Sequence, residues 1–200
     1  MEISILALPL IASIVSGFFG KFIGDRNSEI VTSLLVTISA IFSVLVFYDV
    51  TVNQYEENII IATWINSGSL DVNWSMKIDA LSSVMLVVVT SVSALVHIYS
   101  IGYMSHDPHK PRFMAYLSLF TFAMLMLVTS DNFIQLFFGW EGVGLCSYFL
   151  IGFRFKKDSA NSAAIKAFVV NRVGDFGFAL GIFLIFYLFG TVNYSEVFDL

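Results

Sequence analysis

Six long runs of apolar residues divide this chain and constrain its fold more than any other feature. They cover residues 3–23, 30–48, 80–101, 113–129, 133–153 and 160–189. An α-helix needs about 20 apolar residues to cross the hydrocarbon core of a bilayer, and the runs are close to that length. We therefore predict an all-α polytopic membrane protein with about six transmembrane helices, organised as a single membrane domain over residues 1–200.

The composition supports a membrane protein and excludes several other classes. Only 12% of the residues are charged and 58% are hydrophobic, whereas a soluble domain carries about 25% charged residues. The net charge of −5 offers no basic surface for a nucleic acid, so the lipid bilayer is the expected environment. The single cysteine, Cys146, lies inside a predicted span, which excludes a disulfide framework. No basic residue precedes the first run at Ile3, so we expect a retained helix rather than a removed signal peptide.

The basic residues of the connections predict the orientation in the membrane. One set of connections carries Lys21, Arg26, Lys110, Arg112, Arg154, Lys156, Lys157 and Lys166. The opposite set carries only Lys77. Because basic residues accumulate on the internal side, we expect the amino terminus on the external, periplasmic side, with the chain end at residue 200 on the same side.

The connection between the second and third spans has the alternating pattern of a β-strand. Apolar and polar residues alternate over residues 70–79, and residues 59–65 supply a second strand. We predict a short external β-hairpin that covers the helix ends, a role favoured over ligand binding. Trp64 and Trp74 suit the membrane interface, and Asp79 is placed to cap the third helix.

Glu141 is the most informative single residue, because it lies near the middle of the run 133–153. An ionisable group at the bilayer centre costs about 2.5–3.5 kcal/mol on insertion scales, so a chain that retains one there is expected to use it. Tyr148 shares its helix face, whereas Gly139 and Gly142 lie on another face that suits close helix packing. These features indicate a proton or ion path at Glu141.

A second pair of charges lies in the sixth run. Arg172 and Asp175 are three residues apart, a spacing that predicts an ion pair on one helix turn. Since this pair occupies Arg172, we expect the switchable cation of Glu141 to come from beyond residue 200 or from another chain. Glu141 is then the proton carrier, and Arg172 with Asp175 is a fixed or bistable electrostatic element.

Each of these residues has a structural alternative. Glu141 could be a protonated contact between helices, with Tyr148 or a serine as its partner, and Arg172 with Asp175 could be purely architectural. Tyr148 and His97 are candidates for relay or hydration, although interfacial hydrogen bonding also accounts for a histidine near the end of the third span. His106 and His109 have no accompanying ligands, so we expect a solvated turn and no metal site.

Four stretches carry a resemblance to a known family. They are residues 77–82 (KIDALS), 138–144 (FGWEGVG), 147–153 (SYFLIGF) and 167–177 (AFVVNRVGDFG). Together they resemble the amino-terminal part of the subunit L (subunit 5) family of NADH-quinone oxidoreductase, the antiporter-like membrane subunits of respiratory complex I. The resemblance runs over nearly the whole chain.

The resemblance implies a proton-translocating membrane subunit in a bacterial cytoplasmic or mitochondrial inner membrane. It places Glu141 as the glutamate of the fifth helix, paired with a lysine of a seventh helix, and gives Arg172 and Asp175 a role in coupling. It implies no redox centre or cofactor on this chain, because NADH, flavin, iron-sulfur clusters and quinone belong to partner subunits. The neighbouring membrane subunit M is the expected partner.

Two other functions remain open from the sequence. One is a subunit of a multisubunit sodium/proton antiporter, which shares the glutamate-bearing helix. The other is a non-transporting assembly subunit, since the resemblance places residue 200 within the first of two repeats. Whether the chain is a fragment or a truncated gene product is also left open.

Overall fold

The computed structural model describes residues 1–68 and 70–198. Its long helices are α1 (Glu2–Ile23), α2 (Asp25–Asn53), α3 (Ala80–Tyr103), α4 (Lys110–Val128), α5 (Phe133–Ile151) and α6 (Asp158–Phe189). A hairpin of β1 (Glu57–Ser67) and β2 (Leu70–Ile78) connects α2 to α3, the short 3₁₀ helix η1 (Gly152–Arg154) follows α5, and α7 (Tyr194–Phe198) comes last. All six long helices are long and apolar enough to cross a membrane, which confirms the predicted polytopic fold.

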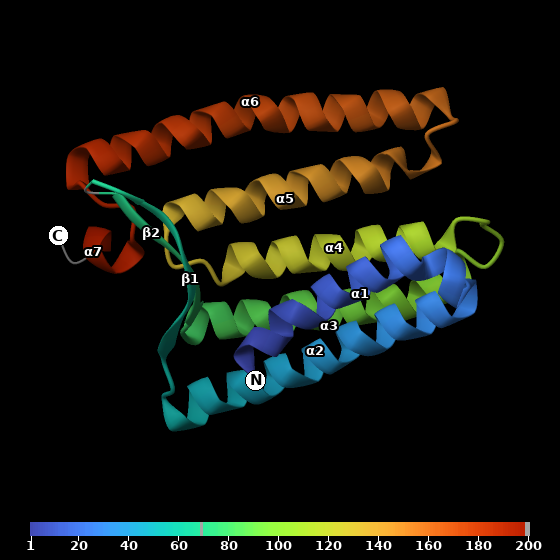
Figure 1. The fold of residues 1–200 in the computed structure, drawn as a ribbon, viewed down its shortest axis with the longest axis horizontal. Coiled ribbons are helices and arrows are strands. Elements are labelled where there is room, and N and C mark those ends of the chain that lie inside the picture. The colour runs from blue at the N-terminus through green and yellow to red at the C-terminus, as the bar shows by residue number, and fades with distance from the viewer. Residues whose placement is uncertain (69, 199–200) are drawn as a thin grey trace.

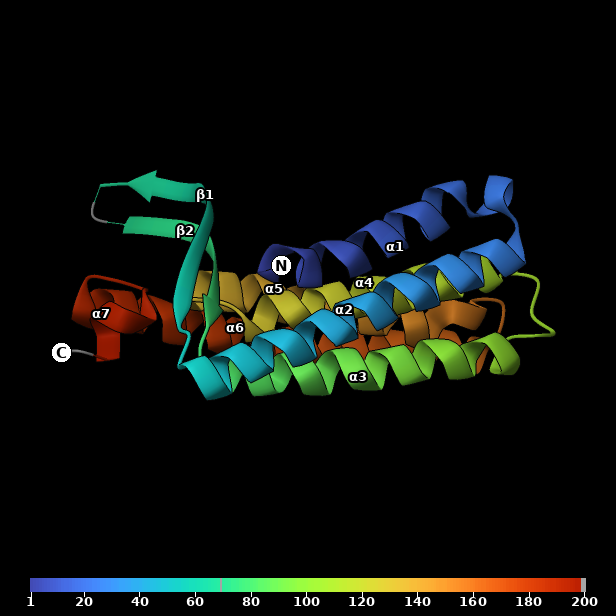
Figure 2. The same cartoon turned by 90° about the horizontal axis from the view of Figure 1, so that it is seen from below.

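The long helices run along the longest axis, each antiparallel to the one before it (Figure 1). Helix α4 packs against α1, α2, α3 and α5, whereas α6 lies at the edge of the bundle and packs mainly on α5. Figure 2 separates α1 from α3, which overlap in Figure 1. The amino terminus and α7 both lie at the hairpin end of the bundle, and the predicted position of residue 200 lies outside the described residues.

The helices extend beyond several predicted runs because polar residues continue them. The second run was predicted over residues 30–48, but α2 begins at Asp25 and ends at Asn53. Its first turn contains an acidic residue, which is favourable beside the positive end of the helix dipole. Apolar residues therefore locate a helix but do not set its ends.

Helices α4 and α5 approach closely through glycine. A Cβ on Gly139 would lie 2.7 Å from Leu127, including its backbone, and one on Gly142 would lie 3.0 Å from Ala123. Cys146, on the same face of α5, is 2% exposed. The predicted small-residue face of the fifth helix is thus the face that packs on α4.

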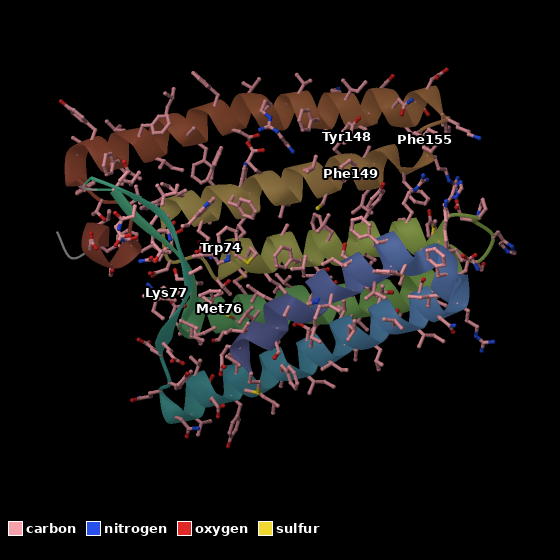
Figure 3. The ribbon with its side chains drawn as sticks, viewed as in Figure 1. Trp74, Met76, Lys77, Tyr148, Phe149 and Phe155 are labelled. Atoms are coloured by element: carbon pink, nitrogen blue, oxygen red, sulfur yellow. The ribbon has the colours of Figure 1, made fainter. Side chains whose placement is uncertain are left out.

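The predicted β-hairpin is present and covers the helix ends. The Gln135 side chain of α5 binds the hairpin through both backbone groups of Ser75. Its Oε1 accepts from the Ser75 N–H at 2.9 Å, and its Nε2 donates to the Ser75 carbonyl at 2.6 Å. Met76 of β2 is fully buried on the side that faces the helices, and Figure 3 shows it at this end of the bundle. The Asp79 side chain accepts from the Ser82 N–H at 2.7 Å, so the predicted cap of α3 is confirmed.

Candidate functional site

Glu141 faces α6 because the opposite side of α5 is occupied by α4. Gly139 and Gly142 contact α4, and the residues that follow Glu141 on its own face point toward α6. Gly144, one turn farther along, lies beside Asn171 of α6. The interface between these two antiparallel helices therefore contains the carboxylate identified from the sequence.

Arg172 joins Glu141 and Asp175 across this interface. Its Nη1 lies 2.5 Å from the Glu141 Oε1 and 3.7 Å from the Asp175 Oδ2. The expectation that the cation of Glu141 must come from outside these residues is therefore wrong. Spacing along one helix does not show this contact, because the long guanidinium side chain on α6 also reaches the neighbouring helix.

Trp140 supplies a further contact that the sequence analysis did not identify. Its indole Nε1 donates to the Asp175 Oδ1 at 2.8 Å, and its ring meets that of Phe178 edge to face. A tryptophan in apolar surroundings needs an acceptor for its N–H, and its position directly before Glu141 was the available signal. Asp175 is thus held from two sides, by an indole of α5 and by Arg172.

Exposure differs among the three charged side chains. Asp175 is 7% exposed, Glu141 is 25% exposed and Arg172 is 50% exposed. The Arg172 guanidinium also lies over the Phe168 ring, 4.8 Å from its centre. Of the three groups, Arg172 is the most exposed, and Asp175 is the most buried and accepts from Trp140.

Tyr148 lies on the same interface, two turns after Glu141 (Figure 3). Its ring contacts Phe168 of α6 and Phe149 of α5. It also lines a cavity of about 200 Å³ that Arg112 and Asn161 share. Glu141 hydrogen bonds to Arg172 rather than to Tyr148, so the alternative of a Glu141–Tyr148 contact does not describe this structure.

His97 lies away from this site, between α3 and α4. It is fully buried between these helices. Its Nε2 lies 3.0 Å from the Ser118 Oγ, and its Nδ1 lies 2.8 Å from the Ser93 carbonyl oxygen. Both ring nitrogens therefore have partners in a hydroxyl-rich contact between two helices, which the structure does not bring together with Glu141.

A buried acid at the opposite end of the bundle from the hairpin was also missed. Glu29 of α2 is 5% exposed, and its Oε1 lies 3.8 Å from the Nζ of Lys110 at the start of α4. No role was predicted for this residue from the sequence. The neighbouring Ser28, Thr32 and Ser33 were the available signal for a buried polar contact.

Two family models match the chain. The model described as "NADH-Ubiquinone oxidoreductase (complex I), chain 5 N-terminus" matches residues 64–114, and the one described as "NADH:quinone oxidoreductase/Mrp antiporter, TM" matches residues 130–200. NADH-ubiquinone oxidoreductase chain 5 of Chondrus crispus is 53% identical over the whole chain, and that of Marchantia polymorpha is 57% identical over 99% of it. NADH-quinone oxidoreductase subunit L of Rhodobacter capsulatus is 53% identical over 99% of the chain. The chain spans only 28–30% of the length of these relatives.

Two solved structures share the fold. A chain of the membrane-bound sulfane sulfur reductase, an archaeal respiratory membrane complex, matches 98% of this chain with a TM-score of 0.84 and 18% identity, and 39% of that chain is covered. A chain of the Mrp complex from Dietzia matches 96% of this chain with a TM-score of 0.79 and 22% identity, and 20% of that chain is covered. At these identities the two structures support the fold alone.

Proposed function

We propose that this chain forms part of a proton-translocating subunit of a respiratory complex. The chain belongs to the antiporter-like membrane subunits of NADH:quinone oxidoreductase. It corresponds to the amino-terminal part of chain 5, which is also named subunit L. The observation that carries the proposal is the contact of Arg172 with two carboxylates on adjacent helices, Glu141 and Asp175. This arrangement can exchange a cation between two acids.

The exchange provides a way to bind and release a proton. A carboxylate in apolar surroundings is stabilised in its protonated form, whereas a nearby cation stabilises the ionised form. When Arg172 contacts Glu141, it favours the ionised acid. When Arg172 moves toward Asp175, Glu141 takes up a proton, and the return of the guanidinium expels that proton. Arginine suits this role because it keeps its own proton throughout.

Trp140 and the unequal exposure of the two acids indicate which group moves and which acid carries the proton. The indole hydrogen bond holds Asp175 in place, so the moving part is the long, half-exposed side chain of Arg172. Glu141 is less buried than Asp175 and can exchange its proton more readily with water. We assign proton transfer to Glu141 and coupling to Arg172 with Asp175. Tyr148 is a hydration or relay group on the same interface, and His97 would act, if at all, in a separate polar contact.

The remaining parts of the reaction are assigned to partners. The complex as a whole oxidises NADH and reduces quinone, and we place NADH, flavin, iron-sulfur clusters and quinone in other subunits. The chain is a multi-pass membrane protein, and the basic connections support an external amino terminus. Another antiporter-like membrane subunit, subunit M, is the proposed neighbour.

A sodium/proton antiporter subunit is the second candidate, since the family model over residues 130–200 also covers Mrp antiporters. The relatives at 50% identity or more that extend over the chain are named as oxidoreductase subunits, which favours the first function. Sodium-dependent transport without quinone reduction would favour the second. If the chain had an assembly role without transport, replacing Glu141, Arg172 or Asp175 would leave proton transport by the complex unchanged.

The substitution Glu141→Gln in the full-length subunit of the assembled complex tests the proposal. Proton uptake into proteoliposomes is measured during quinone reduction, together with NADH oxidation by an artificial acceptor. We expect fewer protons per NADH, with unchanged oxidation by the acceptor. The exposed Glu56→Gln before the hairpin is the matched control. An unchanged proton yield in Glu141→Gln would refute the assigned role.

A further inference from the structure

A basic cavity lies at the end of the bundle opposite the hairpin, away from Glu141. It has a volume of about 450 Å³ and is formed by the α3–α4 connection, the start of α4 and the α5–α6 connection. Its charged lining residues are Asp107, Arg112, Arg154, Lys156 and Lys157. Four cations thus surround one carboxylate, and that carboxylate lies 3.9 Å from Arg154. The cavity therefore retains an excess of positive charge.

Arg112 is incompletely paired within this cavity. Its Nη2 donates to the Phe153 carbonyl at 3.1 Å, and its guanidinium lies over the rings of Phe153 and Phe155. Its Nε is buried without a hydrogen-bond partner, and among residues 1–68 and 70–198 no carboxylate lies within 4.0 Å of it. Buried polar groups normally have partners, and a charged donor is the costliest to leave alone. The guanidinium therefore lacks an anion.

Two helix amino termini meet the same cavity. His109 and Lys157 are the N-cap residues of α4 and α6, and both line it. Neither side chain makes a capping hydrogen bond. The unpaired N–H groups and the dipole of a helix amino terminus attract anions. Asp107 already accepts from the His109 N–H at 2.9 Å, and Asp158 lies in the first turn of α6, so the main attraction for an anion comes from the arginines and lysines.

We propose that this cavity binds the phosphate of an anionic phospholipid. The cavity lies at the ends of membrane-spanning helices, where a headgroup resides, and basic pockets between such helices on the internal side are suited to anionic headgroups. Phe153 and the half-exposed Phe155 line the cavity and provide apolar contacts for the glycerol and upper acyl chain of a lipid. Figure 3 shows Phe155 at this end of the bundle. Free phosphate has no apolar part to make such contacts. The cavity beside Tyr148 shares Arg112 with this one, so a bound lipid would lie next to the end of the α5–α6 interface that is opposite the hairpin.

Binding of fluorescent phosphatidylglycerol to the delipidated complex, containing the full-length subunit in detergent, tests this assignment. We expect saturable binding that phosphatidylcholine does not compete away. Arg112→Gln should weaken it about fivefold, and Arg154→Gln with Lys156→Gln should weaken it about fivefold for each cation removed. The second variant changes exposed side chains only, so it remains informative if Arg112→Gln fails to assemble.

The control is Lys21→Gln with Arg26→Gln, which removes two exposed cations at the same end of the bundle but outside the cavity. It should leave the affinity unchanged. If this control weakens binding as much as the cavity variant does, general surface charge accounts for the binding and the proposed lipid site is refuted. Release of the lipid by millimolar inorganic phosphate would show that the phosphate alone is recognised, and would overturn the lipid assignment.

Discussion

The indole N–H of Trp140 donates to the Asp175 carboxylate at 2.8 Å, so the residue before Glu141 holds the second acid that Arg172 contacts. One turn of α5 thereby contributes Glu141, which contacts Arg172, and Trp140, which hydrogen bonds to Asp175, the other acid near Arg172. The two helices are linked by a single chain of contacts from Glu141 through Arg172 and Asp175 to Trp140. A change at any of these positions should alter how Arg172 is shared.

Removing the indole donor should shift Arg172 toward Asp175. In Trp140→Phe the aromatic volume largely remains, but the carboxylate loses a hydrogen bond of about 1.5–3 kcal/mol. Asp175 then attracts the guanidinium more strongly, and the proton yield per NADH should fall in proteoliposomes. Trp64→Phe is the control, because that indole contacts Trp74 and Phe138 rather than a carboxylate. Equal proton yields in Trp140→Phe and wild type would show that Asp175 needs no such anchor.

The charge and the shape of Arg172 should have separable effects. Arg172→Gln leaves two acids without a cation and should abolish the exchange. Arg172→Lys keeps the charge but loses the planar guanidinium whose Nη1 lies near both acids, so an intermediate proton yield is expected. Both variants are compared in the assembled complex by proton uptake during quinone reduction. A glutamine variant that pumps as well as the lysine variant would exclude the charge exchange.

The hairpin should loosen when Gln135 is replaced. Gln135→Leu leaves the N–H and the carbonyl of Ser75 without partners, at a cost of about 1–3 kcal/mol for each group that remains buried. The measurement is limited proteolysis of residues 57–78 in the intact membrane complex, where cleavage should accelerate. Gln135→Glu retains the acceptor for the N–H and should give an intermediate rate. If Gln135→Leu resists proteolysis as well as wild type, the hairpin is held by contacts other than those of Gln135.

A methyl group at Gly139 should separate α4 from α5. The new Cβ would meet the Leu127 backbone at 2.7 Å, and overpacking of this kind costs about 1–3 kcal/mol. Thermal inactivation of the complex should therefore occur at lower temperature in Gly139→Ala. Gly177→Ala on α6, where nothing lies within 4 Å of the new Cβ, serves as the control and should be neutral or slightly stabilising. If the two variants inactivate alike, the close approach of α4 to α5 does not limit stability.

The α4–α5 turn should show a pH dependence that originates at Asp131. Burial raises the pKa of this carboxyl above its ordinary value of 3.8, while the Asn58 hydrogen bond and the charge of Lys77 act in the opposite direction. The folded state then binds the proton more tightly than the unfolded state. The resulting stabilisation is complete below the unfolded pKa and is lost as pH rises through the folded pKa.

Hydrogen exchange at the Tyr194 amide, which donates to the Asp131 carbonyl at 3.0 Å, reports on this turn. After correction for the intrinsic rate, its protection should fall as pH rises through the folded pKa. Asp131→Asn should remove that dependence, whereas Asp158→Asn, at the start of α6, should retain it. Persistence of the dependence in Asp131→Asn would assign it to another group.

The number and approximate positions of the six long helices were predictable from the sequence because burial in a bilayer acts on whole segments. A run of about 20 apolar residues has one favourable solution, and that solution is a spanning helix. The hairpin was predictable for a related reason, since a period of two residues fixes which side chains share a face of a strand. The cap at Asp79 depends on residues only three apart, so it too is local.

The candidate site was only half predictable. The presence of Glu141, Arg172 and Asp175 inside spans follows from their positions in the apolar runs. Their pairing does not, because it depends on the rotation and the offset of α5 against α6. Within α6 the spacing allowed Arg172 to meet Asp175, but the shorter contact is the one to Glu141 on another helix.

The sequence by itself therefore determined a bundle of membrane-spanning helices, the hairpin that covers it, and the acids that need partners. The tertiary structure alone decided that Arg172 is shared, that Trp140 holds Asp175, that His97 is buried between two helices, and that four cations surround one cavity. The physical reason is that helix periodicity fixes which residues share a face of one helix. Which faces meet is decided by the packing of all the helices together.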